Sequence, residues 1–319
     1  SIVKNERRKS GKQVQRSEAA MQEPVIRTEG LTKYYGKQRG VENLALEVHR
    51  GEVFGFLGPN GAGKTTTMRM LLDLIRPTQG RVEVLGMDAH AQGVAIRERV
   101  GYLPGELSLY DKLTGSEFLQ YMGNLRGGVD WKYVRSLAER LECDLRQRIR
   151  TLSRGNKQKL GILQAFAHRP ELLVLDEPTS GLDPLMQHEF HRLVRELHGE
   201  GTTFFISSHN LAEVERMCDR VGIVRTGSMV AVDEIENLKA RALRKLEIHF
   251  ASPVPLDTFH NLPGVKDVRI ENRTLNCSLV GSMDAVIKAA ARFEVLNVIS
   301  PEVSLEEIFI EYYQGDGDA

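Results

Sequence analysis

The sequence predicts an α/β protein with a mostly parallel, helix-covered sheet, followed by a small α+β domain. Two observations predict it. From about residue 23 to about residue 240, short apolar strand-like runs alternate with amphipathic helix-like runs, which is typical of parallel strands joined by helices. Beyond that point the strand-like runs alternate apolar and polar residues, as half-buried strands do. The 319 residues, 41% of them hydrophobic, are enough for one large core and a smaller one.

The first 22 residues are polar and locally basic. They carry Lys4, Arg7, Arg8, Lys9, Lys12 and Arg16 against Glu6 and Glu18. A segment of this composition cannot bury enough apolar surface to fold, so we expect a flexible, solvated tail. Electrostatic contact with anionic lipid is the alternative.

The domain over residues 23–240 is predicted to contain a sheet interrupted by a helical block. A strand over 51–58, a helix over 64–75 and a strand over 99–104 come first. The block, about 105–169, has apolar residues at three-to-four spacing, which predicts helices over 114–125, 131–142 and 156–168. The strand–helix alternation then resumes with runs over 171–178, 184–199, 202–208 and 211–218.

Residues 241–313 form the predicted α+β domain, for which a regulatory role in dimerisation and plain packing are the two readings. Half-buried strands are expected over 244–250, 264–271, 274–281 and 295–301, and helices over 282–293 and 304–313. Residues 314–319, QGDGDA, are expected to be a solvent-exposed tail.

Composition excludes several classes. The formal net charge is zero, which disfavours a globally basic nucleic-acid binder, so no nucleic-acid partner is expected. The three cysteines lie far apart and predict reduced thiols. No apolar run approaches the roughly 18 residues that a bilayer span requires, so we expect a chain that is soluble in itself and needs a partner for any membrane role.

A phosphate-binding loop is predicted by GPNGAGKTT, which follows a strand and opens a helix. Its glycines permit positive φ and close approach of N–H groups to phosphate, and the helix directs its free N–H groups at the same anion. Lys64 is placed to reach the β- and γ-phosphates, Thr65 to ligate Mg²⁺ and Thr66 to bond the α-phosphate. The nucleotide-binding candidates are Gly58, Pro59, Asn60, Gly61, Ala62, Gly63, Lys64, Thr65 and Thr66.

Two adjacent carboxylates, Asp176 and Glu177, end the apolar run LLVLD. Ligands of open α/β sheets bind at this edge of the strands. Asp176 suits Mg²⁺, held directly or through water. Glu177 is placed to polarise an attacking water as a general base. Ordinary strand-end carboxylates are the alternative.

Together with LSRGN, SGLDP and SSHNLAEVE, these motifs resemble the ATP-binding subunit of an ABC transporter over about residues 25–235. The resemblance implies a P-loop NTPase fold, with a RecA-like core and an inserted helical subdomain. It also implies an ATP hydrolase that uses ATP and Mg²⁺ and whose reaction is coupled to transport.

The resemblance assigns further site residues. Tyr35 matches the aromatic residue that stacks on adenine, with Tyr34 as its competitor. His209 matches the histidine that contacts the γ-phosphate and the catalytic water, and Asp183 matches the loop that communicates across the dimer. Ser153, Arg154, Gly155 and Asn156 match the signature loop, which meets the ATP of a second subunit. Taken alone, Ser153 predicts a helix cap and a phosphate-binding helix end.

The resemblance also implies partners. The family works as a head-to-tail pair of ATP-binding domains, so a homodimer is expected. A separate membrane permease would place the chain at the cytoplasmic face of the cell membrane. The LSRGN form and the ending SLEEIFIEYY are similar to those of exporters of drugs, antibiotics or other hydrophobic compounds.

Two features depart from the usual pattern. The signature reads LSRGN in place of LSGGQ, so Arg154 makes the loop more cationic. The loop after Pro104 carries Gly105 and Glu106 where the family has a glutamine. Glu106 substitutes for that glutamine near the metal, or the metal is held differently. Residues 107–110 follow and are candidate permease contacts.

Other readings remain open. A non-transport ABC ATPase that acts on ribosomes or DNA is the first; it is disfavoured by a single cassette and by the lack of a sustained heptad run. The second is an ATP-gated binding protein with little turnover, which the presence of Glu177 and His209 disfavours. His188 and His191 are spaced as a metal pair or as one face of an exposed helix, and the second is favoured.

Overall fold

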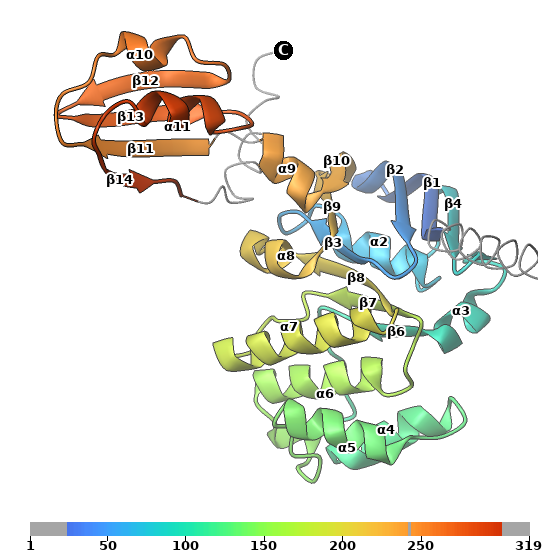
Figure 1. Cartoon of the computed structure of the whole chain (residues 1–319). Coiled ribbons are helices and arrows are strands. Elements are labelled where there is room, and N and C mark those ends of the chain that lie inside the picture. Colours follow the sequence, from blue (N-terminus) through green and yellow to red (C-terminus); the bar gives the residue numbers. More distant parts are fainter. Residues whose placement is uncertain (1–23, 242–243, 302–319) are drawn as a thin grey trace, which may run out of the picture. The chain divides into compact units, whose positions relative to one another are not determined.

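The computed structural model describes residues 24–241 and 244–301 (Figure 1). The chain divides into two compact units, with the boundary between Val232 and Asp233. The predicted tails over 1–22 and 314–319 and the predicted helix over 304–313 lie outside the described residues.

The first unit is built on a six-stranded sheet in the order β10-β9-β3-β8-β7-β6. Neighbours pair in parallel from β9 through β6. Every residue of the three central strands is buried, which is why they read as continuous apolar runs. The strands are β3 (Val53–Leu57), β6 (Val100–Leu103), β7 (Leu172–Asp176), β8 (Thr203–Ser208), β9 (Arg220–Arg225) and β10 (Ser228–Glu234).

A second, antiparallel sheet in this unit was absent from the sequence prediction. Its strands run in the order β2-β1-β4-β5. They are β1 (Pro24–Tyr35), β2 (Gln38–His49), β4 (Gln79–Val84) and β5 (Met87–Asp88). The hairpin of β1 and β2 closes where Tyr35 pairs with Gln38, and this places Tyr35 at its tip.

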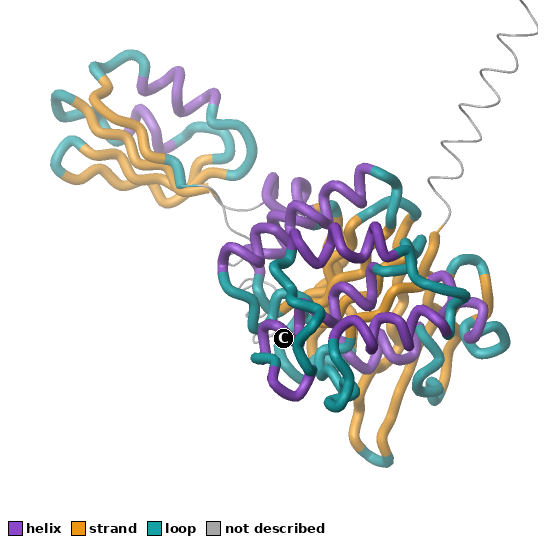
Figure 2. Tube along the Cα trace, turned by 90° about the horizontal axis from the view of Figure 1, so that it is seen from below, coloured by secondary structure: helices purple, strands orange, loops and turns teal. Residues whose placement is uncertain are grey.

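Helices cover these sheets, as Figure 2 shows in purple around the orange strands. The predicted helical block contains three α-helices, α4 (Gly115–Asn124), α5 (Trp131–Arg140) and α6 (Arg154–Phe166), and a short 3₁₀ turn over Ile149–Thr151. Each helix begins at a side-chain cap: Thr114 in a capping box, Asp130 and Ser153. The other helices are α2 (Lys64–Leu71), α3 (Gly93–Arg99), α7 (Pro184–Gly199) and α8 (Leu211–Met217).

The second unit is the predicted α+β fold. Its antiparallel sheet has the order β12-β13-β11-β14, and Phe250, Phe259 and Phe293 meet in its core. The short helix α10 was not predicted. The elements are α9 (Ile235–Arg241), β11 (Arg244–Phe250), α10 (Asp257–His260), β12 (Val265–Glu271), β13 (Thr274–Leu279), α11 (Asp284–Ala290) and β14 (Val295–Ile299).

Two further expectations meet the structure here. Cys143, Cys218 and Cys277 are all buried and unpaired, as reduced thiols are. Across residues 24–241 and 244–301, the helices are too short or too polar to cross a bilayer.

Candidate nucleotide-binding and hydrolysis site

The candidate site is a cavity of about 850 Å³ in the first unit. It lies at the carboxyl ends of β3, β7 and β8, where the chain turns into the phosphate loop, the Asp176–Glu177 pair and the loop of His209. The predicted residues that line it are Tyr35, Pro59, Asn60, Gly61, Gly63, Lys64, Thr65, Thr66, Glu106, Arg154, Asp176, Glu177 and His209.

The phosphate loop wraps the start of α2. Gly61 and Gly63 have φ values of +81° and +102°, which favour glycine, and Gly63 is the N-cap of α2. Lys64 is buried, and its Nζ donates to the carbonyl oxygens of Gly58 (2.6 Å) and Pro59 (3.3 Å). The helix start and the lysine therefore face one cavity, as an anion site requires.

The prediction of positive φ was wrong for Gly58, which is not among the residues with positive φ. Its glycine has another reason. A Cβ at this position would lie 2.4 Å from the carbonyl oxygen of Val224 and 2.9 Å from the Val224 Cγ1. Gly58 is therefore required for close packing between the ends of β3 and β9.

Asp176 is 1% exposed and is held by hydroxyl groups on both oxygens. Thr65 Oγ1 donates to Oδ2 at 2.6 Å, and Ser207 Oγ donates to Oδ1. Burial and then the charge of Asp176 raise the pKa of nearby Tyr102. A carboxylate and a threonine hydroxyl at one edge of the cavity are hard oxygen ligands, so this pair fits Mg²⁺.

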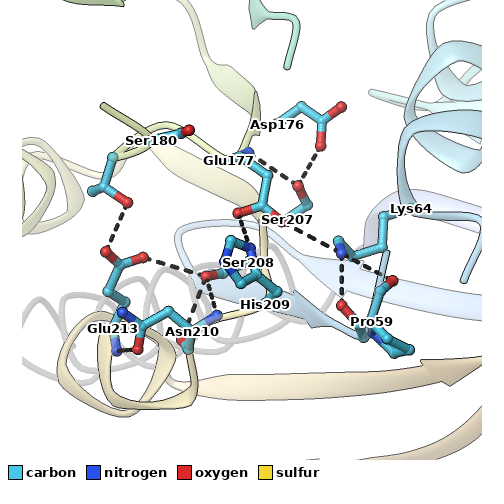
Figure 3. A network of polar contacts seen from close by, with 12 residues as sticks. Pro59, Lys64, Asp176, Glu177, Ser180, Ser207, Ser208, His209, Asn210 and Glu213 are labelled. Carbon is cyan, nitrogen blue, oxygen red and sulfur yellow. Dashed lines mark hydrogen bonds and ion pairs between the residues drawn. The ribbon is translucent and has the colours of Figure 1, made fainter. Parts of the chain in front are cut away.

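Glu177 sits between two basic side chains (Figure 3). Its Oε2 lies 2.7 Å from His209 Nδ1, and its Oε1 lies 3.4 Å from Lys64 Nζ. Oε1 is buried and accepts no hydrogen bond, so its only polar contact among the described residues is the ion pair with Lys64. Such an acceptor is suited to receive a proton from a water molecule.

The backbone of Glu177 is unusual. Its φ is +51°, a conformation uncommon for residues with a side chain. Its N–H donates to the carbonyl oxygen (3.2 Å) and Oγ (3.1 Å) of Ser207, which fixes this turn. Non-glycine residues in this region cluster at functional sites.

Tyr35 and Tyr34 have different surroundings. Tyr34 Oη donates to Glu42 at 2.6 Å. Tyr35 is 47% exposed and lines the cavity, with Lys33 Nζ 5.3 Å from its ring centroid. The Tyr35 ring is therefore the one that presents an open face for stacking.

The loop over residues 153–156 lies against the loop that follows Glu177. Ser153 accepts a bond from the Asn156 N–H at 3.2 Å and caps α6, which confirms the predicted cap. Arg154 Nη2 donates to Ser180 Oγ at 3.1 Å. A Cβ on Gly155 would lie 2.7 Å from the Gly181 carbonyl oxygen, so the two loops pack closely.

Two predicted residues have limited contacts. Asp183 caps α7 by accepting bonds from the N–H groups of Leu185 and Met186. Glu106 is exposed at the cavity wall and has no hydrogen bond or ion pair in the described part of the chain. A Cβ at the preceding Gly105 would lie 3.0 Å from Asp176 Oδ2, so the glycine lets this loop approach the carboxylate.

Sequence reasoning missed a layer of polar residues behind the site. Ser207 bridges Asp176 and Glu177, and Glu213 is buried between the hydroxyls of Thr179 (2.7 Å) and Ser208 (3.3 Å). Gln158 donates from α6 to the backbone after β7. Two serines at the end of an apolar strand, in FFISS, were the available signal.

For His188 and His191 the favoured prediction was an exposed helix face, with a metal pair as the alternative, and the favoured prediction is wrong for His191. His191 is buried in α7, and His188 is exposed on the same helix. Within the described ranges, no group of three or more His, Cys, Asp or Glu side chains is arranged to hold a metal ion.

Comparisons with known proteins identify the family that this chain resembles. The family model described as "ABC transporter" matches residues 41–180. The bacitracin transport ATP-binding protein BcrA of Bacillus licheniformis is 40% identical over 71% of this chain and 75% of its own length. BcrA of Enterococcus faecalis is 35% identical over 93% of this chain and 99% of its own length.

Solved structures give the same fold. An ATP-binding subunit of an ABC transporter is 30% identical, with a TM-score of 0.62, over 67% of this chain and 92% of that chain. A dimeric bacterial ABC transporter cassette, MJ0796, has a TM-score of 0.62 over 66% of this chain and 98% of that chain. At 22% identity, this second likeness shows the fold alone.

Proposed function

This chain belongs to the ABC transporter ATP-binding family, and on that premise we propose that it hydrolyses ATP to drive a separate membrane permease. The observation that carries the proposal is the placement of Glu177 Oε1 at the cavity, where it pairs with Lys64 and accepts no hydrogen bond. The hydrolase activity follows from the family, and the roles of the individual residues are part of the proposal.

ATP binding would begin with charge. Lys64 Nζ donates to two loop carbonyls and forms an ion pair with the Glu177 carboxylate. A triphosphate is a stronger anionic partner than one carboxylate, so Lys64 would turn to the β- and γ-phosphates. Thr66 and the loop N–H groups would bond the phosphates, and the Tyr35 ring would stack on the adenine.

Glu177 is then free for catalysis. Its Oε1 would accept a proton from water while the water oxygen bonds to the γ-phosphorus. The bond from the γ-phosphorus to its bridging oxygen breaks, and ADP and phosphate leave. The 2.7 Å contact with His209 holds Oε2, so Oε1 is the oxygen presented to water. Thr65 and Asp176 would hold Mg²⁺, whose charge would neutralise the phosphate oxygens.

A second copy of the chain would complete each site. Ser153, Arg154, Gly155 and Asn156 would meet the ATP of the partner, with the capped start of α6 directed at its γ-phosphate. ATP then favours the closed pair and its hydrolysis favours opening, which is a population shift that a permease can use. Asp183 lies in the loop between Glu177 and α7, where it would sense the partner.

The cargo proposal rests on the relatives. Two are named as bacitracin transport proteins and one as a linearmycin resistance protein, so we place this chain with exporters of antibiotics or similar hydrophobic compounds. It would act at the cytoplasmic face of the membrane, with residues 107–110 among the contacts to the permease.

Affinity purification of the tagged chain from detergent-solubilised membranes tests the assignment. We expect a polytopic membrane protein in equal copy number, and antibiotic tolerance that requires both proteins. Glu177→Gln is the matched control, since it should keep the complex and lose the tolerance. Recovery with ribosomes or DNA and no membrane protein would instead support a non-transport ATPase.

A further inference from the structure

Helix α6 contacts the loop that carries Glu177 at three successive points. At its start, Arg154 Nη2 donates to Ser180 Oγ at 3.1 Å, and Gly155 packs against the Gly181 carbonyl. One turn further along, Gln158 Nε2 donates to the carbonyl oxygens of Pro178 (2.9 Å) and Glu177 (3.3 Å). Helix α6 therefore contacts this loop at Ser180 and Gly181 and also beside Glu177 itself.

Gln158 differs from the other contacts because it is buried. It is 6% exposed, and its amide bonds backbone carbonyls rather than a side chain. Both of these carbonyls belong to the turn in which Glu177 has a φ of +51°. A residue in this conformation persists only where its surroundings hold it, and Gln158 holds its carbonyl side while Ser207 holds its N–H.

Only a short stretch of α6 separates the signature loop from Gln158. Ser153 caps α6, and Gln158 is the fifth residue beyond it, about 7–8 Å along the axis at 1.5 Å per residue. A helix turn of this length moves as a rigid piece. A displacement of the signature loop is therefore passed to the Glu177 backbone without an intervening flexible segment.

We propose that Gln158 is a positioning residue that couples the signature loop to Glu177 of the same chain. This inference rests on the proposed function, in which the signature loop binds the ATP of the partner. Seating that loop on the partner's ATP would move α6, and Gln158 would bring Glu177 into its hydrolytic position. ATP in one site would thereby activate hydrolysis in the other.

The test compares ATP hydrolysis by the full chain with Gln158→Leu, which keeps side-chain volume and removes the donor. Gln164→Leu is the matched control, because Gln164 is a half-buried amide on the same helix, six residues beyond Gln158. Rates are measured against ATP concentration, together with the thermal midpoint. We expect kcat of Gln158→Leu to fall about tenfold or more, with KM within about twofold and the Hill coefficient falling to one.

The outcomes separate two failures. If the wild-type chain hydrolyses no ATP, the proposed function itself fails. If it hydrolyses ATP cooperatively and Gln158→Leu does the same at a similar rate, only the coupling role fails. The coupling role also fails if the wild-type chain hydrolyses ATP without cooperativity. It fails as well if Gln164→Leu loses as much rate and as much thermal midpoint as Gln158→Leu.

Discussion

At the residue scale, the site gives two adjacent carboxylates different surroundings. Asp176 ends a buried strand and receives hydroxyl bonds on both oxygens, which suits a fixed metal ligand. Glu177 follows with a left-handed backbone and keeps one oxygen that accepts no hydrogen bond. The sequence placed both carboxylates at the strand end, because that edge binds ligands in α/β sheets. It did not predict the role of Ser207, because the serines of FFISS mark a polar strand end but do not identify Asp176, 31 residues away, as the partner.

Two glycines of the phosphate loop should respond differently to alanine. Gly61→Ala meets no atom within 4 Å and costs about 1 kcal/mol through its positive φ. Gly58→Ala brings its Cβ to 2.4 Å from the Val224 carbonyl oxygen, so the loop must shift. Overpacking costs roughly 1–3 kcal/mol, and displaced N–H groups weaken phosphate binding as well.

Thermal unfolding and titration with a fluorescent ATP analogue measure both effects. Gly58→Ala should show the larger loss of stability and the larger loss of ATP affinity. Equal effects of the two variants would remove the packing role of Gly58.

At the element scale, the start of α6 carries the predicted contact with the partner's ATP. Ser153→Arg adds bulk and charge at this end, so ATP-driven dimerisation should be lost while ATP binding by one chain changes little. Ser153→Ala is the comparison variant, since it removes the hydroxyl, and with it the cap, without adding bulk or charge, at about 1 kcal/mol of stability. Light scattering with and without ATP, in the Glu177→Gln background, measures the dimer.

The signature role predicts a dimer defect that is larger for arginine than for alanine. A parallel loss of dimer and of single-chain ATP affinity would contradict it, because that pattern indicates general damage to the fold.

Helix α7 predicts a pH dependence of stability. Burial, and then the charge of Arg216, lowers the pKa of His191 from 6.5 to about 4, and its Nε2 is buried without a hydrogen-bond partner. The unfolded chain therefore binds a proton between about pH 6.5 and 4 that the folded chain does not. Stability should fall as pH decreases through this window.

His191→Leu should flatten this decrease, whereas His188→Leu, at an exposed position on the same helix, should change it much less, because the charge of His188 is a smaller cause of the lowered His191 pKa than burial is. Urea unfolding at pH 7 and pH 5 measures the difference. If wild type and His191→Leu lose the same stability between pH 7 and pH 5, this histidine does not change its protonation on unfolding.

Elements whose apolar residues recur with a regular helical or strand period were predictable from the sequence, and elements in which that period is interrupted were not. Residues 184–199 and 244–250 were predicted with the bounds that α7 and β11 have. Strand β1 was not identified as part of an antiparallel sheet, because its pairing with β2 shifts register between Thr28 and Leu31, beside Gly30 with a φ of +56°. Such a bulge breaks the period of two. Helix α10, with four residues, is too short to show a helical period.

At the scale of the whole molecule, contacts far apart in sequence assemble the site. Thr65 and Asp176 are 111 residues apart, and Glu177 and His209 are 32 residues apart. Motif order and strand ends predicted that these residues share one edge. The distances between them depend on the packing of β3, β7 and β8, which no local pattern encodes.

The central claim is that Glu177 is the general base of an ATPase that works as a pair. Steady-state ATP turnover by Glu177→Gln, measured with ATP binding and molecular mass in the same sample, tests it most directly. The account predicts a loss of about 10²–10⁴-fold in kcat, retained ATP affinity and an ATP-bound dimer that accumulates. Turnover close to that of the wild-type chain, or a variant that stays monomeric at saturating ATP, would contradict it.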